Sequence, residues 1–147
     1  MKILVDADAC PVKNIIVKTA KEYGVAVLMF IDTSHRLNDG YSEVITVDKG
    51  RDAVDIALVN KIQKDDIVVT QDYGVATMAL SKEAHSINQN GLIYTKDNID
   101  KLLFERHLSQ KIRRAGGKAF NAKKRTKADN EKFEETFRQL CLQILKK

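Results

Sequence analysis

The chain has 147 residues, of which 44% are hydrophobic and 31% charged, with one Pro and seven Gly. This length fits one globular domain with its own core, and the composition excludes collagen-like, Pro-rich and wholly disordered proteins. The net charge of +5 is uneven: residues 1–100 carry 11 Lys and Arg against 15 Asp and Glu, whereas residues 101–147 carry 14 against 5. An acidic body with a basic tail is typical of proteins that bind polyanions.

Three features of the sequence exclude a membrane or secreted location. The longest apolar run, Val25–Ile31, is far shorter than the roughly 20 residues of a membrane helix. The N-terminus reaches Asp6 before a signal-peptide core could form. Cys10 and Cys141 provide neither a disulfide framework nor a paired metal motif. We therefore expect a cytoplasmic protein with no membrane segment.

Strands and helices alternate along the first part of the chain. Short apolar runs predict strands, and the periodic segments between them predict helices that begin near Pro11, Ala53 and Tyr73. The predicted strands cover residues 3–5, 25–31, 44–47 and 67–70. This order predicts an α/β fold with a mostly parallel central sheet and helices on both faces.

The pattern is weaker after residue 85. Residues 86–88 and 92–94 flank an Asn-Gly turn and form either a hairpin or a bent edge strand. A helix is expected over 97–114, its inward residues being Ile99, Leu102, Leu103 and Ile112. Thr126 and Asp129 begin a last helix, whose apolar stripe is Phe133, Phe137, Leu140, Cys141 and Ile144. We expect an α/β domain over 1–114, with 115–147 forming a basic loop and a helix packed on the same domain.

Five aspartates are expected at one edge of the sheet. Asp6 and Asp8 end the first strand, Asp72 follows the strand over 67–70, and Asp52 and Asp55 begin a helix. The carboxyl ends of parallel strands and the starts of the following helices share the edge where ligands bind. Crowded carboxylates require raised pKa values or a cation. An all-oxygen set with no His or Cys nearby favours Mg²⁺ or Mn²⁺ over Zn²⁺ and points to phosphodiester hydrolysis.

A purely structural role is the alternative for these aspartates. Asp52 and Asp55 suit the positive end of a helix dipole, and Asp8 and Asp72 could cap helices. Lys13, Lys49 and Arg51 flank the same edge, where they could neutralise a phosphate or form surface salt bridges. Cys10 is expected to pack or to line the site, and His35 could contact a substrate.

The motifs that carry these residues resemble the YaiI/YqxD family of small bacterial proteins. The resemblance covers nearly the whole chain and rests on Val5–Lys13, Lys49–Asp55, Asp66–Ala76, Arg113–Lys118 and Ala128–Phe133. It implies a PIN-like nuclease fold, which is a three-layer sandwich. It also implies that the protein holds Mg²⁺ or Mn²⁺ and cuts RNA.

The same resemblance implies individual roles. Asp6, Asp55 and Asp72 match the acidic positions of PIN nucleases. Thr70 matches the hydroxyl residue that accompanies the acid after the fourth strand, which is Asp72 in this chain. The acid expected after the second strand has no clean match among Ser34, His35, Asp39 and Glu43, and its place falls to Asp8 and Asp52. The metal ligands are thus predicted to be Asp6, Asp8, Asp55 and Asp72, with Asp52 in support.

A basic run without acidic residues precedes the last helix. It could follow a nucleic-acid backbone, or it could be a solvated charged loop. Only Phe120 interrupts it with an aromatic ring, so base stacking is not supported. The predicted nucleic-acid contacts are Lys111, Arg113, Arg114, Lys118, Lys123, Lys124, Arg125 and Lys127.

Three functions follow from these features. The first is a metal-dependent nuclease or phosphodiesterase acting on RNA. The second is a phosphatase similar to the haloacid-dehalogenase type, in which Asp6 attacks phosphorus and Asp8 is the acid/base. The third is a non-catalytic RNA-binding or ribosome-associated module, in which the aspartates are structural and the basic tail selects the partner.

Overall fold

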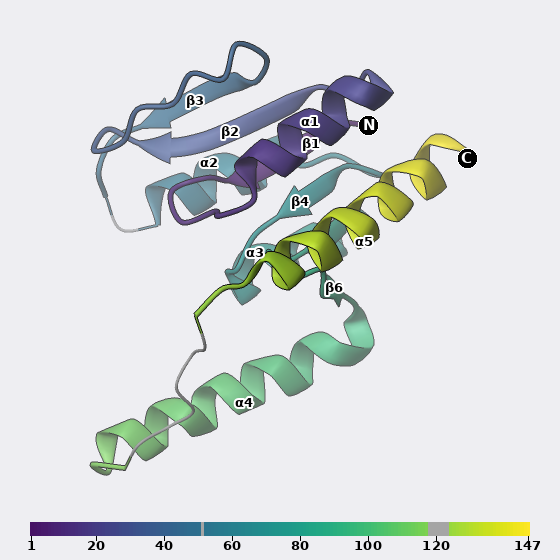
Figure 1. The fold of residues 1–147 in the computed structure, drawn as a ribbon. Helices are drawn as coiled ribbons and strands as arrows, with labels where there is room; N and C mark the ends of the chain where they lie inside the picture. The colour runs from purple at the N-terminus through teal and green to yellow at the C-terminus, as the bar shows by residue number, and fades with distance from the viewer. Residues whose placement is uncertain (51, 118–123) are drawn as a thin grey trace.

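The computed structural model describes residues 1–50, 52–117 and 124–147. Its centre is a six-stranded sheet of order β3-β2-β1-β4-β5-β6 (Figure 1). Every neighbouring pair is parallel except β5 and β6, which are antiparallel. The strands are β1 (Ile3–Asp6), β2 (Val27–Asp32), β3 (Glu43–Val47), β4 (Ile67–Val69), β5 (His85–Ile87) and β6 (Ile93–Tyr94). The predicted α/β class with a mostly parallel sheet is confirmed.

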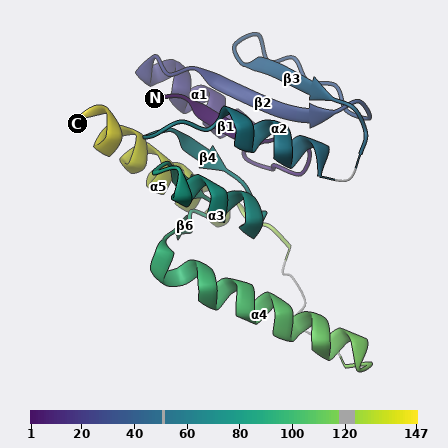
Figure 2. The ribbon, with the colours of Figure 1, turned by 180° about the vertical axis from the view of Figure 1, so that it is seen from behind.

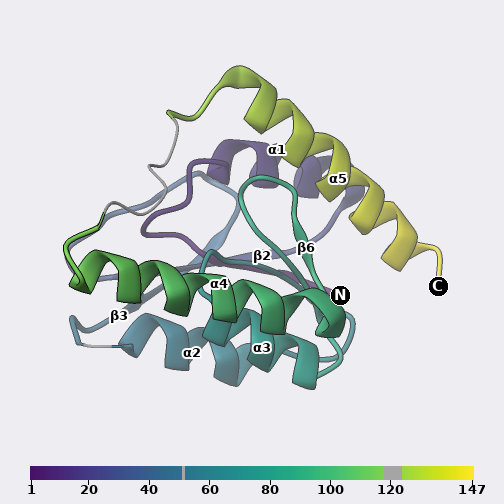
Figure 3. The same cartoon turned by 90° about the horizontal axis from the view of Figure 1, so that it is seen from below.

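Helices cover both faces of this sheet, so the molecule has three layers (Figure 3). One face is covered by α1 (Lys13–Tyr23) and α5 (Lys127–Leu145), and the other by α2 (Ala53–Lys61) and α3 (Tyr73–Ser81). Helix α4 (Lys96–Arg114) packs beside α3 and extends away from the sheet (Figure 2). Each described helix is too short or too polar to cross a membrane.

The two-residue period of β1 divides the core between the faces. Ile3 and Val5 pack with α1 and α5, whereas Leu4 packs with α2 and α3, and all three side chains are fully buried. Helix α5 contributes its predicted stripe, including the stacked rings of Phe133 and Phe137, to the first of these clusters. The sheet edge that carries the aspartates is therefore supported by packing on both sides.

The segment after β5 turns back as a hairpin, which decides between the two predicted alternatives. The side chain of Asn88 accepts hydrogen bonds from the backbone N–H groups of Asn90 and Leu92, both at 2.9 Å. Gly91 has φ +85°, and a Cβ atom there would lie 3.2 Å from the carbonyl oxygen of Lys132 in α5. A glycine is therefore required both by the turn and by the close approach of α5.

Two details of the prediction were wrong. Helix α1 begins at Lys13, and not at Pro11, which lies in the preceding turn. In α4, Ile99 is buried, but Leu103 and Ile112 are 39% and 40% exposed. The reason is that α4 packs on α3 through its first turns and then continues beyond the sheet and its packed layers.

Because α5 packs against the sheet, we expect truncation of the buried Phe137 ring to lower the stability of the fold markedly. We expect Phe137→Ala to lower the free energy of unfolding by about 3–5 kcal/mol, because the change removes buried apolar surface and leaves a cavity. Leu145→Ala is the control, since Leu145 is 46% exposed on the same helix. Urea denaturation of both variants measures the difference, and a loss below about 1 kcal/mol for Phe137→Ala would contradict this account of the core.

Candidate metal centre

Asp6 and Asp72 are linked through the hydroxyl group of Thr70. Asp6 ends β1, and its Oδ2 atom accepts a hydrogen bond from Thr70 Oγ1 at 3.3 Å. The same Oγ1 atom accepts a hydrogen bond from the backbone N–H of Asp72 at 3.0 Å. Asp72 in turn caps α3, because its Oδ1 atom accepts the N–H of Val75 at 3.0 Å. The hydroxyl of Thr70 thus holds the Asp6 carboxylate at the carboxyl edge, and the backbone at the start of α3 holds that of Asp72.

The carboxylates at this edge disturb one another's titration. Burial raises the pKa of Asp6, the hydrogen bond from Thr70 opposes this rise, and the charges of Asp8 and Asp72 add to it. Burial also raises the pKa of Asp55 to about 6, and the charges of Asp72, Asp6 and Asp52 contribute further. Burial is thus the largest cause of both shifts, and repulsion among the crowded carboxylates adds to it. The charge of each of four predicted aspartates therefore raises the pKa of Asp6 or of Asp55; these four are Asp6, Asp8, Asp52 and Asp72.

Two pockets open on either side of Asp72. One, of about 360 Å³, is lined by Asp6, Asp72, Tyr73 and Arg106 together with Ala9 and Gln71. The other, of about 470 Å³, is lined by polar and apolar side chains that include Asp52, Asp55 and Asp72. The carboxylates thus face space in which a ligand can reach them.

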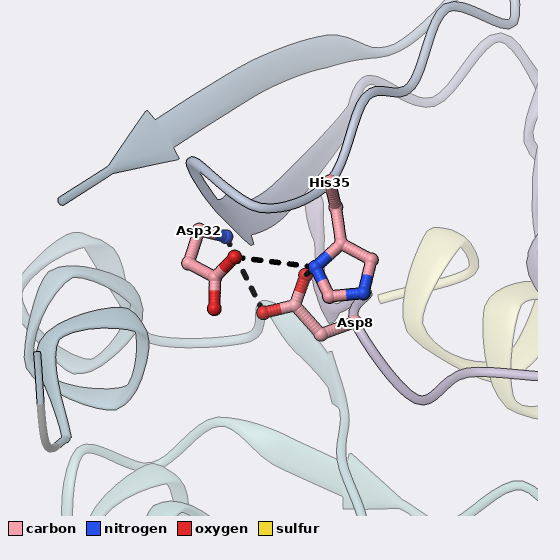
Figure 4. A group of neighbouring side chains, drawn as sticks. All are labelled: Asp8, Asp32 and His35. Atoms are coloured by element: carbon pink, nitrogen blue, oxygen red, sulfur yellow. Dashed lines mark hydrogen bonds and ion pairs between the residues drawn. The ribbon is translucent and has the colours of Figure 1, made fainter. Parts of the chain in front are cut away.

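A second group of ligand atoms lies beside the first (Figure 4). Asp8, Asp32 and His35 each offer one atom, and these atoms lie within 4.8 Å of one another. The Nδ1 atom of His35 is 3.1 Å from Asp8 Oδ1 and 3.2 Å from Asp32 Oδ1, and Asp8 Oδ2 accepts the backbone N–H of Asp32 at 3.3 Å. Asp8 Oδ1 is shielded from solvent, and the imidazole of His35 is its polar neighbour. The three side chains thus bring two carboxylate oxygens and a ring nitrogen within reach of one ion.

Asp32 is the residue that sequence reasoning missed. It is the last residue of β2, so the rule that selected Asp6 and Asp72 also selects Asp32. Hydrogen bonds from the hydroxyl and the backbone N–H of Ser34, with a smaller contribution from His35, lower the pKa of Asp32. The expectation that no His lies near the carboxylates was wrong. The choice of Mg²⁺ or Mn²⁺ stays a prediction, because a mixed oxygen and nitrogen set is open to a wider range of metals.

The structural alternative of helix capping holds for Asp72 but not for Asp8, because α1 has no side-chain cap. The helix-dipole alternative stays open for Asp52 and Asp55, since Asp52 is the N-cap residue of α2 and Asp55 lies in its first turn. Asp52 is exposed, with φ +63°, at the start of α2. Lys13 donates from Nζ to the carbonyl oxygen of Ala7 at 3.2 Å and thereby holds the turn between Asp6 and Asp8. Arg51 lies outside the described residues.

The predicted nucleic-acid contacts are distributed over two helices and the loop between them. Lys111, Arg113 and Arg114 are exposed at the end of α4, and Lys124 and Lys127 are exposed before and within α5. Lys118 and Lys123 lie outside the described residues.

Arg125, the remaining member of the run, bonds within the protein. Its guanidinium donates hydrogen bonds to Asn130 Oδ1 and Asn90 Oδ1, both at 2.7 Å, and to the carbonyl oxygen of Gln89 at 2.6 Å. It ties the start of α5 to the β5–β6 turn. A contact with nucleic acid by any of these residues stays a prediction.

The raised pKa of Asp55 predicts a pH-dependent gain in stability on neutralising it. With a folded pKa of about 6 against 3.8 ordinarily, its charge destabilises the metal-free protein above pH 6, and this effect is lost as the pH falls to about 4. Asp55→Asn should therefore raise the melting temperature at pH 8 by about 3 °C, on the order of 1 kcal/mol after solvent screening, and should not raise it at pH 4.

Calorimetry in EDTA makes this measurement. Asp100→Asn, which neutralises an exposed carboxylate on α4, is the control and should leave the melting temperature unchanged at both pH values. A lower melting temperature for Asp55→Asn at pH 8 would show that the Asp55 carboxylate stabilises the fold, contrary to the repulsion described above.

Relatives of this chain are found among bacterial proteins. Residues 4–143 match the model described as "Uncharacterized BCR, YaiI/YqxD family". A UPF0178 protein of Ruminiclostridium cellulolyticum is 68% identical over 92% of this chain and 88% of its own length, and one of Clostridium kluyveri is 52% identical over 97% and 93%. No solved structure matches significantly, so the PIN-like fold stays a prediction. From its match over nearly the full length, the chain belongs to the YaiI/YqxD family.

Proposed function

We propose that this chain is a metal-dependent phosphodiesterase that cleaves RNA at the carboxyl edge of its sheet. The observation that carries the proposal is the convergence of Asp32, Asp6 and Asp72, which follow the adjacent strands β2, β1 and β4. Among the described residues, no Lys or Arg nitrogen lies within 4.0 Å of the carboxylates of Asp6, Asp8, Asp55 or Asp72. A cation is the partner that such uncompensated charge calls for.

The donor atoms fit a divalent cation. Among the described residues, Asp8, Asp32 and His35 are the group whose ligand atoms lie close enough to share one ion, and they offer two oxygens and a nitrogen. Asp6, Asp55 and Asp72 offer only oxygen, as Mg²⁺ prefers, but their side chains do not form a group of this kind. Mn²⁺ accepts both kinds of donor, and the solvent-shielded Oδ1 atom of Asp8 is suited to either ion. When bound, the cation would supply an activated water and neutralise charge on the phosphate.

The chain's own residues would hold these groups in place. Thr70 holds Asp6, and the N–H of Val75 holds Asp72, so neither carboxylate has to be ordered when a substrate arrives. Burial and the charges of Asp72 and Asp6 raise the pKa of Asp55 in the metal-free chain, and a bound cation would favour its ionised form. The acidic edge by itself repels a polyanion, so the basic residues of α4 are needed to hold the RNA.

Cleavage of a labelled RNA in the presence of Mn²⁺ tests the proposal. We expect EDTA to abolish cleavage, and Asp6→Asn, Asp32→Asn and Asp72→Asn each to slow it by about 100-fold or more. Asp65→Asn is the matched control, since Asp65 lies at the opposite edge, just before β4, with φ +67°, a conformation that Asn also adopts readily. This control should cleave at the rate of the unaltered chain.

Two outcomes would overturn the proposal. Intact RNA in Mn²⁺, together with unchanged Mn²⁺ binding by Asp6→Asn, would remove both the activity and its metal centre. Hydrolysis of small phosphomonoesters with a beryllofluoride adduct on Asp6 would instead establish the phosphatase.

A further inference from the structure

A groove leads from the aspartates along α4. The pocket of about 360 Å³ that contains Asp6 and Asp72 shares Tyr73 and Arg106 with a neighbouring pocket of about 530 Å³. The second pocket is lined mainly by one face of α4, which includes Ser109, Gln110 and Arg113. Because two residues line both pockets, the two spaces adjoin and form one path from the carboxylates to the far end of the helix.

Arg106 is held at the junction of the two pockets. Its guanidinium carbon lies 5.8 Å from the centroid of the Tyr73 ring, within the range of a cation–π contact. Tyr73 is fixed by an edge-to-face contact with the buried ring of Tyr94, with the two centroids 5.9 Å apart. No carboxylate oxygen of the described residues lies within 4.0 Å of Arg106, and Glu105 in the same groove is paired with Lys101 at 3.9 Å. The charge of Arg106 is therefore available to an anion beside Asp6 and Asp72.

Arg113 places a second cation farther along the groove. It follows Arg106 by seven residues, which is two helical turns and about 10 Å along the axis. Ser109 and Gln110 lie between the two arginines and offer hydrogen-bond donors to the same space. Two cations at this separation suit a ligand that carries more than one phosphate better than they suit a mononucleotide. The groove follows a single helix, so the cations form one line that suits one phosphate chain.

We propose that this groove is the binding path for single-stranded RNA, with Arg106 contacting the phosphate next to the aspartates and Arg113 a phosphate farther along. The nature of the ligand rests on the proposed function, whereas the groove and its two arginines do not. The proposal selects one face of α4: Arg113 lines the groove, but its neighbour Arg114 does not.

The neighbouring arginines provide a test with a matched control. Binding of a fluorescein-labelled oligouridylate to the full chain is measured by anisotropy in EDTA, so that cleavage does not interfere. We expect Arg113→Ala and Arg106→Ala to weaken binding about tenfold each and to reduce the slope of log K against log salt by about 0.7. Arg114→Ala removes the same charge and should weaken binding less than about threefold. Arg106→Lys, which keeps the charge, should lose less affinity than Arg106→Ala.

The possible results distinguish the groove, the choice of ligand and the proposed function from one another. Equal losses for Arg113→Ala and Arg114→Ala would overturn the groove, because they would show diffuse attraction to a charged helix. Binding of uridine monophosphate or of duplex RNA as tightly as the oligouridylate would overturn the choice of ligand. Arg113-dependent binding without Mn²⁺-dependent cleavage would uphold the groove and remove the proposed function, whereas cleavage that is unchanged in Arg106→Ala and Arg113→Ala would do the reverse.

Discussion

Repulsion between carboxylates at one edge of a parallel sheet is the constraint on which the rest of this molecule depends. Adjacent strands lie about 4.8 Å apart, so the aspartates that end β2 and β1, and Asp72 after the end of β4, come close whatever their side chains require. The fold offsets part of this cost locally. Thr70 donates to Asp6, the N–H of Val75 donates to Asp72, and His35 lies between Asp8 and Asp32. The raised pKa values of Asp6 and Asp55 show that repulsion and burial are not fully offset.

The core explains how such an edge can persist in the metal-free chain. The central strands are buried on both faces, with α1 and α5 on one side and α2 and α3 on the other. These layers fix where the strands end and so hold the aspartates together. The packed core therefore holds the carboxylates close together despite their repulsion, and a divalent cation would reduce that repulsion.

The order of elements was predictable because buried parallel strands and amphipathic helices leave clear periodic patterns. The site was only partly predictable. Asp32 was predictable, since it follows an apolar run just as Asp6 and Asp72 do. The approach of His35 to Asp8 depends on the path of the backbone after β2, which no spacing encodes. The exposure of Leu103 and Ile112 depends on where the sheet stops beneath α4, which is a tertiary property.

The same tertiary information changes the meaning of the uneven charge. The basic side chains of residues 101–147 do not all have the same role in the folded chain. Arg125 bonds within the protein, whereas Arg106, which lies outside the basic run, stands beside the aspartates. The opposite charges of body and tail thus meet at one pocket, where an anion held by the arginines would lie against the acidic edge.

The central claim is that the strand-end carboxylates bind a divalent cation, and crystals of the full chain soaked in Mn²⁺ test it most directly. Anomalous scattering locates the ion without reference to any assumed ligand. The account predicts a peak at the carboxyl edge, with metal–oxygen distances of about 2.1 Å to Asp6 and Asp72, to Asp8 and Asp32, or to both pairs. An edge without a peak, in crystals that bind Mn²⁺ elsewhere or not at all, would contradict it.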